Sequence, residues 1–130
     1  MGANALVEIS VADAVELAKK LDAIGKSPSL VAWFYYEDAD EWRLVLAGPA
    51  FEQPAAKQEV AYRTVLEAMS NLPLTSLTAS DIKIIPMATP IVDAIRMIVR
   101  TGPTGIVRAH LTNTMLNGVF IKEVVIIRSA

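Results

Sequence analysis

The chain has 130 residues, a net charge of −2, 53% hydrophobic residues and no cysteine. This length suits one domain, residues 1–130, with a core large enough to need no disulfides, and the lack of cysteine excludes thiolate chemistry. The N-terminus lacks the pattern of a signal peptide and the apolar runs are too short to cross a bilayer, so we expect a cytoplasmic protein.

The first predicted element is a helix over residues 11–24. Ser10 begins a Ser-x-x-Asp pattern, close to the capping box of a helix N-terminus, ahead of apolar residues at helical spacing. Gly25 stands where a left-handed residue would end that helix. Asp13 and the other charged residues of the segment are expected on its solvent-exposed side.

A β-hairpin and a second helix follow. Residues 30–37 and 42–48 are rich in β-branched and aromatic side chains, and the acidic stretch 38–41 joins them, which predicts two antiparallel strands. The acidic turn is expected to be solvated rather than to bind a metal. Apolar residues on one stripe then predict a helix over 56–71.

The next two elements are a short strand and a third helix. Residues 81–86 predict a strand that Pro86 ends, and Thr89 is expected to cap a helix that begins at Pro90 and runs to about Arg100. Because this helix is apolar nearly all round, we expect it to be largely buried.

The chain ends in a second predicted hairpin, residues 106–116 and 119–128. Asn117-Gly118 joins them, and this dipeptide favours a type I′ turn in which both residues have positive φ. The predicted order is therefore α-β-β-α-β-α-β-β. The β-α-β-α-β middle of the chain requires some parallel pairing. We expect an α/β (α+β) fold with a single mixed five-stranded sheet and three helices.

The stretch RMIVRTGPTGIVRAH, residues 96–110, is the strongest candidate for a ligand site. Its two glycines follow a helix and precede a strand, the reverse of a phosphate loop, so Gly102 is interpreted as the cap of the helix C-terminus. An anion could still be bound through side chains alone, by Arg96, Arg100, Arg108 and His110. The alternative is that Arg96 pairs within its helix with Asp93, and that His110 is an ordinary surface residue.

Asp81-Ile82-Lys83 matches the acid-x-Lys fragment of metal-dependent nucleases, in which carboxylates hold Mg²⁺. A second carboxylate would have to come from the acidic turn 38–41. The fragment is short enough to occur by chance, so this hypothesis ranks below the others. The aromatic residues near the first hairpin have acidic neighbours, which argues against nucleic-acid binding. No catalytic constellation, metal site or cofactor is expected.

The segments WFYYEDADEWRLVLAGP and TNTMLNGVFIKEVVIIRS resemble corresponding parts of a family of small bacterial α/β proteins of uncharacterised function. This resemblance implies a bacterial cytosolic origin. It implies no site residues.

Both predicted hairpins are apolar on both faces. Two amphipathic helices fill little more than one face of a sheet, so a monomer would leave an apolar face exposed. Three helices that straddle the sheet are the competing explanation. We expect a homodimer joined through the sheet by Ile121, Val125, Ile127, Trp33, Tyr35 and Trp42.

These patterns favour a non-enzymatic protein-binding or assembly module that forms a homo-oligomer. The alternative is a small enzyme or binder of an anionic small molecule that uses the Arg96, Arg100, Arg108 and His110 group. A metal-dependent nuclease centred on Asp81 and Lys83 is the weaker alternative.

Overall fold

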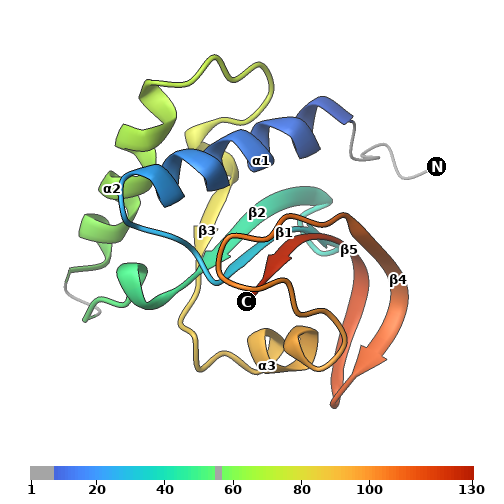
Figure 1. Ribbon diagram of the computed structural model, residues 1–130. Coiled ribbons are helices and arrows are strands. Elements are labelled where there is room, and N and C mark those ends of the chain that lie inside the picture. Colours follow the sequence, from blue (N-terminus) through green and yellow to red (C-terminus); the bar gives the residue numbers. More distant parts are fainter. Residues whose placement is uncertain (1–7, 55–56) are drawn as a thin grey trace.

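The computed structural model describes residues 8–54 and 57–130, and its elements are in the predicted order (Figure 1). They are α1 (Glu8–Ala23), β1 (Leu30–Tyr36), β2 (Glu41–Ala47), η1 (Pro49–Phe51), α2 (Gln58–Ser70), η3 (Ala79–Asp81), β3 (Ile82–Ile84), α3 (Pro90–Arg96), β4 (Ala109–Leu116) and β5 (Val119–Ser129), where η marks a 3₁₀-helix. The predicted fold, three helices and one mixed five-stranded sheet, is confirmed. Residue 56, where the second helix was predicted to begin, lies outside the described residues.

The sheet has the strand order β3-β2-β1-β5-β4. β2 and β3 are parallel, and α2 lies in the crossover that such a pair requires. The other three pairs are antiparallel. Strands from the two ends of the chain, β1 and β5, are neighbours in the middle of the sheet, so the central pairing depends on contacts distant in sequence.

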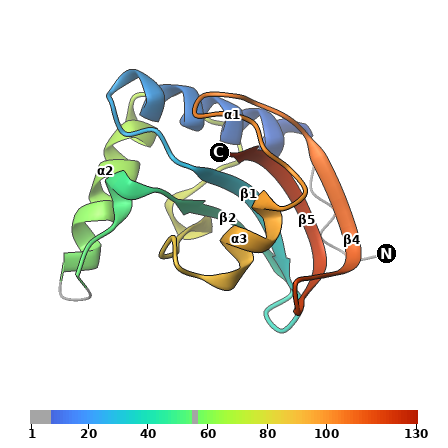
Figure 2. The same cartoon turned by 60° about the horizontal axis from the view of Figure 1, so that its bottom comes forward.

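Helices cover both faces of the sheet (Figures 1 and 2): α1 and α2 lie on one face and α3 on the other. The cluster under α1 and α2 includes the strand residues Val31, Trp33, Leu44, Val125 and Ile127. The cluster under α3 includes Ala32, Phe34, Val45, Val124 and Ile126. Alternate residues of one strand thus enter two different cores, which explains why the strands are apolar on both faces.

Because helices cover both faces of the sheet, the predicted dimer interface was based on a wrong assumption, that one apolar face would stay exposed in a monomer. Trp33, Val125 and Ile127 are 3%, 4% and 0% exposed in the core under α1 and α2. Ile121 is 3% exposed and lies under α3, on the other face. Tyr35 and Trp42 are half-buried and pack against each other, with ring centroids 5.6 Å apart. The three helices straddle the sheet, so the apolar faces need no second chain to cover them.

In the final hairpin Leu116 lies opposite Val119 and Thr112 opposite Glu123, the register expected for a two-residue turn at Asn117-Gly118. Asn117 and Gly118 both have positive φ, 47° and 81°, as the turn was predicted to require. The regular alternation of the two faces fails beyond the middle of the hairpin.

The cause lies at Asn113, which has a φ of 45° and interrupts the ladder. As a result, Ile121 and Val124 both face α3, although strict alternation would put them on opposite faces. We call residues 113–122, from this kink through the turn, the hairpin tip.

Two predicted features of α1 are corrected. The helix begins at Glu8, so Ser10 lies inside it, and its hydroxyl is 2.9 Å from the Ser76 hydroxyl. Asp13 is 5% exposed rather than on the solvent side. Its carboxylate accepts the backbone N–H groups of residues 75, 76 and 77 at 3.1, 2.7 and 2.9 Å. The predicted end of the helix is confirmed, with Gly25 at a φ of 76°.

The third helix is shorter than predicted and ends at Arg96. Val92, Ala94 and Ile95 are buried as expected, but Met97 and Ile98 after the helix are 71% and 49% exposed. The chain instead turns toward the end of β5, where the Thr101 N–H donates to the Ser129 carbonyl at 2.7 Å. Gly102, with a φ of 79°, therefore belongs to a separate turn and does not cap the helix.

The beginning of the third helix is confirmed by position, with Pro90 as its first residue. Thr89 is the N-cap residue, but its side chain makes no capping hydrogen bond.

Candidate functional site

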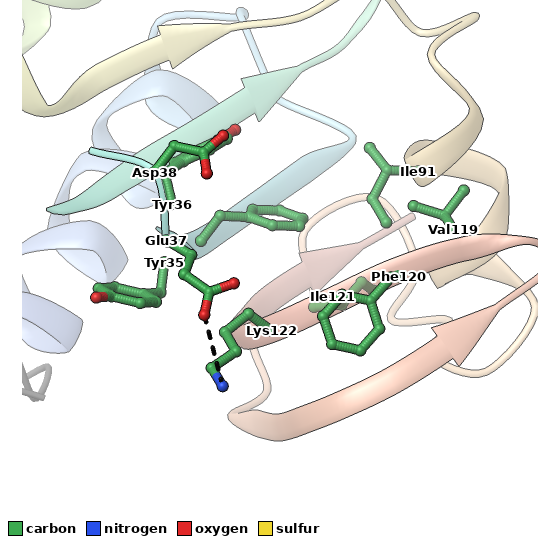
Figure 3. A pocket seen from close by; sticks show the side chains of 10 residues that line it. Tyr35, Tyr36, Glu37, Asp38, Ile91, Val119, Phe120, Ile121 and Lys122 are labelled. Atoms are coloured by element: carbon green, nitrogen blue, oxygen red, sulfur yellow. Dashed lines mark ion pairs between the residues drawn. The ribbon is translucent and has the colours of Figure 1, made fainter. Parts of the chain in front are cut away.

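A groove of about 350 Å³ lies where the β1–β2 turn meets the hairpin tip (Figure 3). Three parts of the chain line it: the end of β1 with its turn, α3 and the start of β5. The lining residues are Phe34, Tyr35, Tyr36, Glu37, Asp38, Ile91, Val119, Phe120, Ile121 and Lys122. The antiparallel pairing of β1 with β5 thus brings residues 34–38 beside residues 119–122.

The groove has an apolar wall and a charged rim. Ile91 and Val119 lie close together at one end in Figure 3, and Phe120 projects from β5 beside them. At the other end, the Lys122 ammonium lies 3.8 Å from the Glu37 carboxylate. A site of this composition can hold an apolar side chain with a charged group next to it, which is a property of protein-recognition sites.

The side chains of the acidic β1–β2 turn are held by local contacts. The Tyr35 hydroxyl donates to Asp40, and this hydrogen bond raises the pKa of Tyr35. Arg43 pairs with Glu41, and the ammonium of Lys83 lies 4.5 Å from the centroid of the Tyr36 ring. Over residues 8–54 and 57–130, no three His, Asp or Glu side chains come together in a way that could hold a metal ion.

The hairpin tip carries two large apolar side chains that none of the described helices covers. Met115 and Phe120 are directly opposite each other in the β4–β5 ladder and are 63% and 54% exposed. The neighbouring Leu116 is half-buried and packs against the cluster under α3. Val119 is half-buried and lines the groove. The tip therefore presents an apolar surface that adjoins the groove.

The predicted anion-binding residues do not converge on one site. Arg96 and Arg100 line a shallow hollow at the end of α3, and Arg96 lies 3.9 Å from Asp93, the intrahelical pairing given as the alternative.

The other two residues of the group lie on the opposite face of the sheet. Arg108 pairs with Glu8 of α1, and this hydrogen bond lowers the pKa of Glu8. The His110 imidazole lies 2.7 Å from the carboxylate of Glu123, and His110 is opposite the α1-side residue Val125 in the ladder.

The nuclease fragment is divided in a similar way. The Asp81 carboxylate accepts the Thr78 N–H at 2.9 Å and completes a capping box for η3. Lys83, on the edge strand β3, lies over the ring of Tyr36. It lines a hollow with Asp38 and Glu41, and Asp81 does not line this hollow. The carboxylate that would hold a metal therefore has a structural partner instead.

Sequence reasoning missed the most buried charge of the chain. Arg128 is fully buried, and its guanidinium donates two hydrogen bonds of 2.8 Å to the Asp22 carboxylate and one of 3.0 Å to the Gly105 carbonyl. Burial raises the pKa of Asp22, but hydrogen bonds from Arg128 and Ser27 outweigh it, so the pKa is lowered overall. The available signal was an arginine directly after the apolar run VVII. Arg128 therefore connects α1, β5 and the 102–105 turn through its hydrogen bonds, which is a structural role.

No protein-family model matches the sequence, and no curated protein or solved structure is significantly similar to it. None of the helices in the described part of the chain combines the length and the apolarity that spanning a membrane requires.

Proposed function

We propose that the chain is a non-enzymatic protein-binding and assembly module that forms a homo-oligomer, in the simplest case a dimer. The observation that carries this proposal is the apolar surface of the hairpin tip, which residues 8–54 and 57–130 leave exposed. Met115 and Phe120 are 63% and 54% exposed and adjoin a groove of about 350 Å³ with an apolar wall. Large apolar surfaces that adjoin a groove and a polar rim typically mark sites of protein contact.

The placement of the ionisable groups favours the same proposal. Catalysis needs a nucleophile or general base next to an orienting partner and a space for substrate. Asp13, Asp22 and Asp81 instead hold backbone N–H groups or a buried guanidinium, and His110 pairs with Glu123 on an exposed strand surface. The arginines proposed to bind an anion lie on opposite faces of the sheet.

We further propose that the module works in the cytoplasm of a bacterium. A chain without cysteine gains nothing from an oxidising compartment, where small domains commonly rely on disulfides. The resemblance of two segments to small bacterial proteins supports the same assignment.

Light scattering after size exclusion, from low to high micromolar concentration, tests the oligomeric state. The expected mass is twice the 14.1 kDa of the chain. A mass of one chain over the whole range would contradict self-association. In parallel, thermal shift with sugar phosphates, nucleotides and divalent metals tests the two alternatives. A stabilisation that Arg108→Ala abolishes would favour an anion binder over an assembly module.

A further inference from the structure

The groove adjoins an exposed aromatic side chain of the same chain, Phe120. We infer that two copies of this chain associate through their hairpin tips, each inserting Phe120 into the groove of the other. This inference rests on the proposed function and names the contact surface. Phe120 lies on the rim of its own groove, is 54% exposed and follows a tight turn at the end of a hairpin. A projecting side chain and a matching hollow therefore adjoin on one surface.

Such a surface can be self-complementary. In a two-fold symmetric dimer, residue i of one copy meets residue j of its partner, and j meets i in return. With the axis passing near the tips, each Phe120 leaves its own rim and enters the partner's groove against apolar residues such as Ile91 and Val119. Both exposed aromatic rings are then covered by one contact, and Met115, which lies opposite Phe120 in the ladder, is at its edge.

The charges on the rim favour a second copy as the occupant. Lys122 lies two residues after Phe120 on β5, and both side chains line the groove. When Phe120 enters the partner's groove, Lys122 is brought to the partner's rim, where Glu37 and Asp38 lie. Lys122 is already attracted to Glu37 within one copy, at 3.8 Å, and both side chains are exposed enough to exchange partners. The rim of one copy thus carries both the positive and the negative charges that would pair with the rim of a second, identical copy.

The first test compares two substitutions of exposed apolar residues. Phe120→Glu is expected to weaken the dimer on the order of 30-fold or more, the loss typical of an aromatic residue at the centre of an interface. Val60→Glu is the matched control because Val60 is a 39% exposed apolar residue on α2, away from the tip. It is expected to leave the dimer mass unchanged. A dimer that persists in Phe120→Glu would overturn the inference.

The second test uses charge reversal and does not depend on the fold tolerating a change at Phe120. Lys122→Glu alone and Glu37→Lys alone each place like charges on the two rims and should weaken self-association. An equimolar mixture of the two variants places opposite charges at both contacts and should form heterodimers. Analytical ultracentrifugation measures all three samples. A mixture that dissociates as readily as the single variants would contradict the contact.

The absence of cysteine in the chain permits a third, direct test. Met115→Cys should form a disulfide-linked dimer under mild oxidation, and Glu67→Cys, on the exposed side of α2, should not. A wild-type chain that is monomeric would contradict the proposed self-association. A wild-type dimer that resists Phe120→Glu and is not cross-linked through Met115→Cys would contradict only the tip contact.

Discussion

The two hairpins have similarly apolar sequences but different surroundings. In the β1–β2 hairpin, Trp33, Leu44 and Val45 are 3%, 0% and 1% exposed between α1 and α2 on one side and α3 on the other. In the hairpin tip, Met115 and Phe120 are more than half exposed. The strand β5 connects the two regions, because its residues from Val124 onward pair with β1 and residues 119–122 lie in the tip. An apolar strand is therefore buried only where helices reach it.

The largest expected effect is at Arg128, near the C-terminal end of β5. Arg128→Ala should lower the free energy of unfolding by about 4 kcal/mol, because it leaves the largely buried Asp22 carboxylate without its cation. Urea denaturation at fixed protein concentration measures the change. Arg63→Ala, on the exposed side of α2, is the control and should stay within about 0.5 kcal/mol of the wild type. A loss below about 1 kcal/mol for Arg128→Ala would mean that water replaces the guanidinium.

A matched pair of truncations compares the two hairpins directly. Leu44→Ala removes a side chain that is 0% exposed in the core under α1 and α2, and it should cost about 3 kcal/mol. Met115→Ala, in the tip, should cost less than about 0.5 kcal/mol in the same unfolding experiment on dissociated chains. Similar losses for the two variants would show that the tip is covered within one chain.

The Asn117-Gly118 turn between β4 and β5 should be sensitive to backbone strain alone. Gly118 has a φ of 81°, and a side chain added there would meet no atom within 4 Å. Gly118→Val should therefore cost about 1 kcal/mol because a β-branched residue resists positive φ. Gly118→Asn, which tolerates this conformation better, should cost less. Thermal melting of both variants checks the order, and an equal melting temperature for valine and wild type would contradict it.

The smallest expected effect is confined to acidic pH. Hydrogen bonds from Arg128 and Ser27 lower the pKa of Asp22 in the folded chain below its ordinary value of 3.8. The unfolded chain therefore binds this proton first, and the stabilisation present above that value is lost as the pH falls through the lowered pKa. Asp22→Asn should remove this part of the acid dependence. Urea midpoints measured at several pH values below 5 test it, with Asp38→Asn on the exposed turn as the control.

Much of the fold could be predicted because it depends on local patterns. Helical spacing with Gly25, the β-branched strands, and the Asn117-Gly118 turn act over a few residues, and each lies close to its predicted position. The boundaries differ where a distant partner intervenes. The third helix ends at Arg96 because the chain after it turns to the end of β5.

The candidate site could be predicted only in part. The apolar excess and the position of the hairpin were visible in the sequence, but the exposure of Phe120 was not. The predicted dimer face was placed on residues such as Val125 and Ile127 that α1 and α2 cover. The positive φ of Asn113 reverses the faces of the tip, and no alternating pattern reveals such a kink. The groove itself combines residues 34–38 with residues 119–122, which only the β1–β5 pairing brings together.

The sequence by itself determined the order of the elements, the type I′-compatible turn and the absence of any cysteine chemistry, because these depend on composition and on neighbours along the chain. The tertiary structure alone decided which apolar surface is covered and which charges meet. Arg96 and Arg108 are twelve residues apart yet lie on opposite faces of the sheet, whereas Asp22 and Arg128, at opposite ends of the chain, form a buried ion pair. Burial and electrostatic pairing depend on distance in space, which strand order sets and local sequence does not encode.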